Sequence, residues 1–302
     1  MRATSNAWMT AGALALMLAG SGVLATTTRG GQSPSTQQGT QAAPAQQQPD
    51  AADKNKQGTT PPPLSMDAAP AAASPEEEAA FKAFQDAPIA DPTKKDQLGE
   101  DFLQKYPQSR YRGVVYQGLV SGYFATQQVP KLLDAGDKEI ALNPNDAPVL
   151  AVVAQTIARS FNAQAPNAAE QLEKAEQYSK RAIEITPTLP KPAALNDEQF
   201  TMAKNDTLEM AHGGLGLVYI RKAKFAEAIP ELEQSIKADT HPQPDPVNYY
   251  LLGMANSKTS HFDAAAAAFA KCAAIQSSLT PTCKSGAEEA KKAGASQLSA
   301  PN

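Results

Sequence analysis

The sequence predicts an all-α fold: a superhelix (α-solenoid) of antiparallel helix pairs, preceded by a disordered tether. Apolar residues recur at spacings of three and four from residue 75 to about residue 293, the pattern of helices with one buried face. The C-terminal part also matches itself at an offset of 37 residues, which pairs Leu215 with Leu252 and Phe225 with Phe262. The composition changes at Ser74, where a segment rich in Gln, Pro and Ala ends.

Composition excludes several classes of function. The chain has 302 residues, with 27 Lys and Arg against 31 Asp and Glu, so its formal charge is −4. A general nucleic-acid binder usually carries an excess of basic residues on its contact face, so no nucleic-acid partner is expected. Three histidines and two cysteines cannot form a Cys/His zinc site of conventional spacing, and no cofactor is predicted.

The first 25 residues have the layout of an export signal. Arg2 precedes the apolar run Ala11–Ala19, and small residues follow at Val23–Ala25, where a signal peptidase would cleave. The alternative is a retained membrane anchor over residues 7–25, whose 19 residues would form about 28 Å of helix. Both alternatives place the rest of the chain outside the cytoplasm, in the periplasm or cell envelope, with the membrane reached only through this segment.

Residues 26–74 are predicted to be a disordered linker. Residues 31–74 contain eight glutamines and seven prolines, no aromatic residue and one branched aliphatic residue, Leu64. Such a segment buries too little apolar area to offset an ordering entropy of about 1–2 kcal/mol per residue. We therefore expect a flexible spacer; a ligand for a proline-binding module is the alternative.

Helices are expected from residue 75 to residue 294, and residues 295–302 are expected to be a disordered tail. Ser74-Pro75 and Asp91-Pro92 each combine a capping side chain with a proline at the first helical position. In the two C-terminal copies the second helix repeats an apolar stripe at i, i+3, i+4, i+7 and i+11. The stripes are Phe225, Ala228, Ile229, Leu232 and Ile236, then Phe262, Ala265, Ala266, Phe269 and Ala273.

On these residues the chain resembles the tetratricopeptide repeat family, whose helix pairs carry small and aromatic residues at fixed positions. One copy matches at His212, Leu215, Gly216, Tyr219, Ala228, Leu232 and Ser235; the last matches at Tyr249, Leu252, Gly253, Asn256, Ala265, Phe269 and Cys272. The resemblance implies a right-handed superhelix of four to five pairs. A polar helix over residues 285–292 is expected to cap it, and the insert at residues 190–208 is expected to include an exposed loop.

No catalytic site is predicted. His212-Gly213-Gly214 and Gly214-Leu215-Gly216 are fragments of esterase and nucleotide-binding motifs. The strand and third glycine that a nucleotide loop needs are missing, as is the nucleophile elbow of an esterase. Small residues at a helix contact account for both fragments.

The resemblance implies that a protein or peptide partner binds along a groove lined by the first helix of each pair. The corresponding positions in this sequence are Gln117, Ser121, Phe124, Gln155, Leu217, Ile220, Tyr250 and Met254. The alternative is that such residues are buried by neighbouring helices and bind nothing. The predicted function is a non-catalytic interaction scaffold of the cell envelope. An accessory subunit of an envelope enzyme or assembly machine, for outer-membrane protein insertion or cell-wall synthesis, is the alternative.

The two cysteines are expected to form a disulfide. Cys272 lies on the buried face of the last repeat's second helix, where the family usually has alanine, and Cys283 follows eleven residues later. An exported chain meets an oxidising compartment, and an even number of cysteines fits pairing. Alternatively, Cys272 is a small core residue and Cys283 a free thiol.

Overall fold

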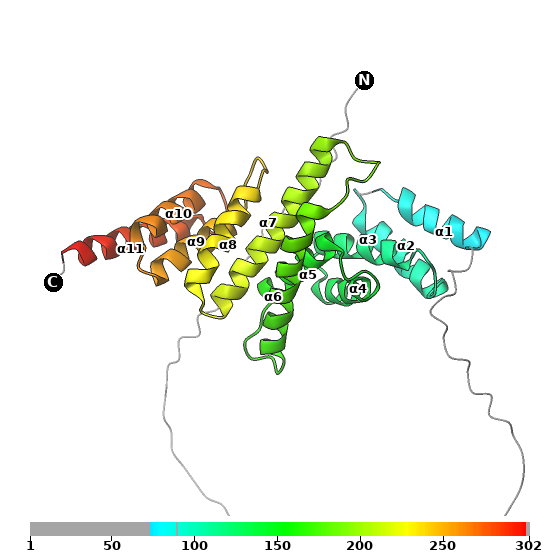
Figure 1. The fold of residues 1–302 in the computed structure, drawn as a ribbon, viewed down its shortest axis with the longest axis horizontal. Helices are drawn as coiled ribbons and strands as arrows, with labels where there is room; N and C mark the ends of the chain where they lie inside the picture. The colour runs from blue at the N-terminus through cyan, green and yellow to red at the C-terminus, as the bar shows by residue number, and fades with distance from the viewer. Residues whose placement is uncertain (1–72, 89, 300–302) are drawn as a thin grey trace, which may run out of the picture. The chain divides into compact units, whose positions relative to one another are not determined.

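The computed structural model describes residues 73–88 and 90–299, so the predicted signal or anchor and almost all of the linker lie outside the described residues. Over the described ranges the chain is helical and has no strand. Five helix pairs are followed by a single last helix (Figure 1). They are α1 (Pro75–Asp86) and α2 (Pro92–Lys105), α3 (Arg112–Ala125) and α4 (Val129–Leu142), α5 (Ala147–Arg159) and α6 (Ala168–Ile185), α7 (Asp197–Arg221) and α8 (Phe225–Ala238), α9 (Pro246–Lys258) and α10 (Phe262–Ala274), and α11 (Thr280–Leu298).

The predicted helix starts are confirmed by their caps. The side chain of Ser74 accepts a hydrogen bond from the backbone N–H of Glu77, and Asp91 accepts one from Lys94, both at 3.1 Å. In each helix a proline follows the cap, where its missing N–H leaves no hydrogen bond unmade. These short polar signals fix where the first two helices begin.

Three of the pairs share one turn geometry. Between α3 and α4, α7 and α8, and α9 and α10, three residues connect the helices, and the middle one has a positive φ: 57° at Gln127, 56° at Ala223 and 62° at Ser260. In each turn the third residue donates its N–H to a carbonyl five residues earlier, over 2.8–2.9 Å. The α3–α4 pair is therefore built like the two C-terminal pairs, although its sequence differs.

The core runs between neighbouring pairs and uses the predicted stripes. Ala228, Leu232, Ala265 and Phe269 are buried, at 6% exposure or less. Glycines on the first helices of the α7–α8 and α9–α10 pairs admit the large side chains: a Cβ on Gly216 would lie 2.7 Å from Leu232, and one on Gly253 would lie 2.7 Å from Phe269. The glycine of each repeated Leu-Gly dipeptide thus marks where the second helix packs closely against the first.

The exposed loop predicted within the insert at residues 190–208 is present and ends at Asn196. Asn196 and Gln199 form a capping box there and start α7, which takes up the rest of the insert. One predicted boundary is wrong. The last helix continues to Leu298, so residues 295–298 are not a disordered tail. It also begins at Thr280, ahead of the predicted cap at residues 285–292, with a proline in its first turn.

Candidate functional site

Two of the predicted groove residues are not accessible. Gln155 is 4% exposed and Leu217 is 3% exposed, so neither lines an open wall. The reason is the close approach of α5 and α7, where a Cβ on Gly214 would lie 3.2 Å from the backbone nitrogen of Gln155. Small residues on both helices allow this contact, and it covers the surface that the sequence assigned to a partner.

Three further groove residues pack against the core. Ile220, Tyr250 and Met254 are half-buried and contact the apolar clusters of the array. The ring of Tyr250 lies 5.9 Å from that of Phe269, centroid to centroid. A charged substitution at these positions would therefore disturb packing as well as any surface, and cannot report on binding alone.

The remaining predicted residues lie along α3. Gln117 is exposed and Ser121 is half-buried, and Phe124 is half-buried and, like the three residues above, packs against the apolar core. Val114, which the sequence reasoning missed, precedes Gln117 by three residues and is 50% exposed. We call these four residues the α3 face. Their spacing of i, i+3, i+7 and i+10 places them on one side of the helix, with apolar groups at both ends and polar groups between them.

Gln117 is held by the start of the next pair. Its Nε2 donates a hydrogen bond of 3.1 Å to Oδ2 of Asp146. The other carboxylate oxygen of Asp146 accepts the backbone N–H of Val149, also at 3.1 Å, and so caps α5. One buried aspartate therefore joins the α3 face to the first turn of α5.

Glu139, on α4, is a second buried carboxyl group at this junction. It is 3% exposed, and its Oε2 has no hydrogen-bond partner among the described residues. Burial, and then the charge of Asp146, raises the pKa of Glu139 from 4.5 to about 7. Burial raises the pKa of Asp146 as well.

Asp96 is a separate buried carboxylate at the α2–α3 contact. It is 4% exposed, and neither of its oxygens has a hydrogen-bond partner among the described residues. A Cβ on Gly122 would overlap its Oδ1, so the carboxylate lies directly on the backbone of α3. Burial, and then the charge of Glu100, raises the pKa of Asp96 from 3.8 to about 6.

Asp96→Asn is expected to stabilise the protein at pH 7. A rise in pKa from 3.8 to about 6 corresponds to a cost of about 3 kcal/mol for keeping the charge buried. The asparagine amide is still buried, so we expect a net gain of about 1–2 kcal/mol in the free energy of unfolding. Urea unfolding at pH 7 and pH 5 tests this. The increase in the free energy of unfolding should be smaller at pH 5, where Asp96 itself becomes protonated. An equal increase at both pH values would contradict the interpretation of Asp96 as a buried charge.

A second polar network joins the third pair to the fifth. Arg159, at the end of α5, forms an ion pair of 2.6 Å with Asp245, which caps α9. Beside it, Glu209 of α7 accepts a hydrogen bond of 2.7 Å from Asn248. Burial, and then the charge of Asp245, raises the pKa of Glu209 to about 7. Each of these two bonds joins different helix pairs, so the arrangement is structural.

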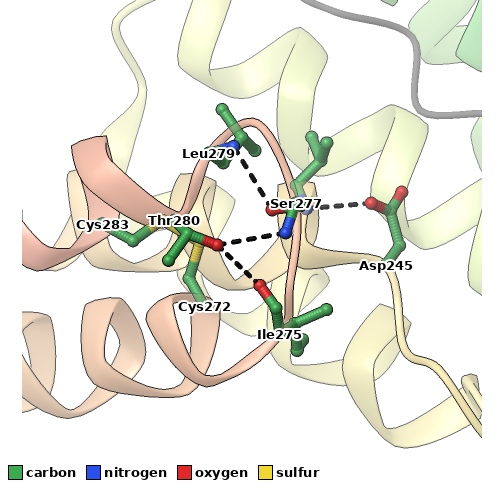
Figure 2. The surroundings of a disulfide bond; sticks show 8 residues. Asp245, Cys272, Ile275, Ser277, Leu279, Thr280 and Cys283 are labelled. Carbon is green, nitrogen blue, oxygen red and sulfur yellow. Dashed lines mark hydrogen bonds between the residues drawn. A yellow bond between two sulfur atoms is a disulfide. The ribbon is translucent and has the colours of Figure 1, made fainter.

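The structure joins Cys272 and Cys283 in a disulfide whose Cα atoms lie 5.8 Å apart. Both residues are fully buried, and the bond connects α10 to the first turn of α11. Figure 2 shows the intervening turn, in which Thr280 donates a hydrogen bond to the carbonyl of Ile275 and accepts one from the N–H of Ser277. Figure 2 also labels Asp245 of the neighbouring α9 cap, whose side chain accepts a hydrogen bond of 2.9 Å from the backbone N–H of Val247.

Within residues 73–88 and 90–299, no group of three or more His, Cys, Asp or Glu side chains is placed to hold a metal ion. In the same ranges, none of the helices combines the length and apolar character that crossing a bilayer requires. What the site offers is a helical surface on α3, joined to the first turn of α5 through Gln117 and Asp146.

The fold is that of a helical repeat protein, because helix pairs stack in succession, three of them share one turn geometry, and glycines allow close contact between paired helices. Residues 211–241 and 247–278 match the family model described as tetratricopeptide repeat. These segments cover most of the α7–α8 and α9–α10 pairs. Residues 211–278 therefore resemble two successive tetratricopeptide repeats.

Two solved structures are similar in fold. One is a thermophilic tetratricopeptide repeat protein from Thermus thermophilus, with 17% identity, a TM-score of 0.42, and coverage of 72% of this chain and 98% of that one. The other is a tetratricopeptide repeat protein from Parabacteroides merdae, with 12% identity, a TM-score of 0.27, and coverage of 72% and 99%. No curated protein matches the sequence. Both similarities are to the fold alone.

Proposed function

We propose that the chain is a non-catalytic scaffold of the cell envelope that binds a segment of a partner protein on the α3 face. The exposed position of Val114 beside Gln117 is the observation that carries this proposal. Helical repeats serve protein–protein interaction, and their first helices supply the contact surface. The envelope location rests on the export-type sequence at residues 1–25.

The chemistry of the α3 face favours a segment with apolar side chains rather than a charged tail. Val114 and Phe124 can contact such side chains at the two ends of the face. Since Gln117 uses its Nε2 for Asp146, its amide oxygen can accept a hydrogen bond from a partner N–H. None of the four residues carries a charge, so we expect binding to depend little on salt.

Val114→Glu is expected to reduce partner capture at least about tenfold, because it places a charge against an apolar contact at a cost of more than about 1.4 kcal/mol. The measurement is chemical cross-linking in envelope fractions of the source organism, followed by quantitative mass spectrometry of the captured proteins. Thermal unfolding should be unchanged, since Val114 is 50% exposed.

Met202→Glu is the matched control. Met202 is 49% exposed and lies on α7, so the same change in charge occurs at equal exposure on another surface. Capture should be retained in this variant. Equal loss in both variants, or loss in neither, would contradict the assignment to the α3 face. Sequencing the N-terminus of the protein from the same fractions tests export separately, by showing whether residues 1–25 are removed.

A further inference from the structure

Arg221, the last residue of α7, is half-buried and differs from the other arginines of the described chain. Its Nε is buried and has no hydrogen-bond partner among the described residues. A guanidinium carries five N–H donors, so an arginine that is partly desolvated and unpaired needs an explanation. The other arginines of residues 73–88 and 90–299 each donate a hydrogen bond to a neighbouring side chain. These pairs are Arg110 with Glu78, Arg112 with Gln108, Arg159 with Asp245, and Arg181 with Asn145 and Glu184.

An aromatic ring lies next to the guanidinium of Arg221. Phe161 follows α5 and is half-buried against the core, and its ring centroid lies 5.8 Å from the guanidinium carbon. The ring attracts the cation but gives its N–H groups no strong acceptor. The last turn of α7 also favours a cation, through the helix dipole. Neither contact supplies the pair of oxygen acceptors that a guanidinium fork binds best.

The acidic groups around the end of α7 are bonded to other cations. Lys222, the residue after Arg221, binds the carboxylates of Glu173 and Glu176. Lys180 binds Glu176 as well. Burial lowers the pKa of Arg221, and no acidic neighbour offsets that effect. Among the described residues, the end of α7 thus keeps one positive charge that no carboxylate neutralises.

We propose that Arg221 and Phe161 form a binding site for a carboxylate group. The carboxylate accepts hydrogen bonds from the fork of Arg221, and the hydrocarbon next to it contacts the ring of Phe161. One unpaired positive charge matches the single negative charge of a carboxylate, whereas a phosphate ester would bring nearly two. The site lies at the ends of α5 and α7 and uses no residue of the α3 face, so it goes beyond the function proposed above.

Nuclear magnetic resonance of the full chain, labelled with ¹⁵N-arginine, tests the site directly. The Nε–Hε signal of Arg221 is assigned by its disappearance in Arg221→Met. An acidic side chain and a free carboxyl terminus present the same group, so two peptides separate these sources. They are acetyl-Ala-Glu-Ala-amide and acetyl-Ala-Ala-Ala with a free carboxyl terminus, and acetyl-Ala-Ala-Ala-amide is the control without a carboxylate.

The Arg221 signal should shift at millimolar concentrations of at least one carboxylate peptide and reach saturation. The peptide that binds more tightly identifies the source of the carboxylate. The signal of Arg181 is the internal reference and should not move, since that side chain already binds Glu184. No shift of the Arg221 signal with either carboxylate peptide, or an equal shift with the amide control, would overturn the proposal. Tighter binding of inorganic phosphate than of both peptides would overturn it as well.

Thermal unfolding separates a binding role of Arg221 from a structural one. Arg221→Met keeps an aliphatic chain against Phe161 and removes an unpaired, partly buried charge, so it should melt at the same temperature as the wild type or higher. Arg159→Met is the matched control, because it breaks the ion pair with Asp245 and should lower the melting temperature. An equal loss in the two variants would show that Arg221 stabilises the fold as Arg159 does, and would overturn the proposal.

Discussion

Phe269→Ala is expected to lower the free energy of unfolding by about 3–5 kcal/mol, the usual cost of removing a buried phenylalanine. Phe269 is 6% exposed and lies between three helices. Glycines on both sides approach its ring, since a Cβ on Gly253 would lie 2.7 Å away and one on Gly286 3.0 Å away. The neighbouring helices cannot close the cavity left by the missing ring without changing the helix contacts at Gly253 and Gly286.

The measurement for Phe269→Ala is urea unfolding of the full chain, followed by circular dichroism. Because the ring joins α9, α10 and α11, we expect an early transition that corresponds to these helices. Phe262→Ala is a suitable comparison, since Phe262 lies on the same helix but is only partly buried. A loss in Phe269→Ala no larger than in Phe262→Ala would mean that the C-terminal core is not organised around this ring.

Removing the disulfide is the second change with a large expected effect. The bond closes a loop between residues eleven apart, for which the chain-entropy estimate is about 3 kcal/mol. The double variant Cys272→Ala, Cys283→Ala should therefore unfold at a clearly lower urea concentration. The loss should be concentrated in α11, which the bond ties to α10, and hydrogen exchange of residues 280–298 measures it.

The control for the disulfide is the wild-type protein unfolded with and without a reductant. Reduction in the native state should be slow, because both sulfur atoms belong to fully buried residues. Once reduced under denaturing conditions and alkylated, the chain should resemble the double variant in α11. Mass spectrometry of unreduced, denatured protein after alkylation also tests the bond directly: labelling of both cysteines would show that it does not form.

The repeat architecture could be predicted from the sequence because capping residues and apolar spacing mark individual helices locally. Ser74 and Asp91 cap helices, and the spacing of Leu232 and Phe269 marks buried faces in both copies. These signals act within one or two turns, so they can be recognised in a single sequence. The extra turns of α7 were missed because the capping box at Asn196 falls inside a segment that the repeat pattern treats as an insertion.

The candidate site was less predictable, because it depends on how neighbouring pairs approach. Gln155 and Leu217 were predicted to line a groove, but the close approach of α5 and α7 at Gly214 buries Gln155, and Leu217 packs into the core. The burial of Glu139 is equally hidden, since many glutamates near a helix end are exposed and bonded to water. A sequence shows that a carboxylate is present, but the distance to its neighbour is set by tertiary packing.

The ion pair between Arg159 and Asp245 has a consequence for how the protein folds. In a simple repeat array each unit touches only the next one, so folding can begin at any repeat and spread by short steps. This bond joins residues 86 apart in the chain, with α6, α7 and α8 between them. It can form only after that whole segment has been ordered, which adds a long loop closure to the route. The helices from α5 to α9 should consequently fold and unfold as one cooperative unit. The α1–α2 pair, at the N-terminal end of the array, can fold and unfold independently of them.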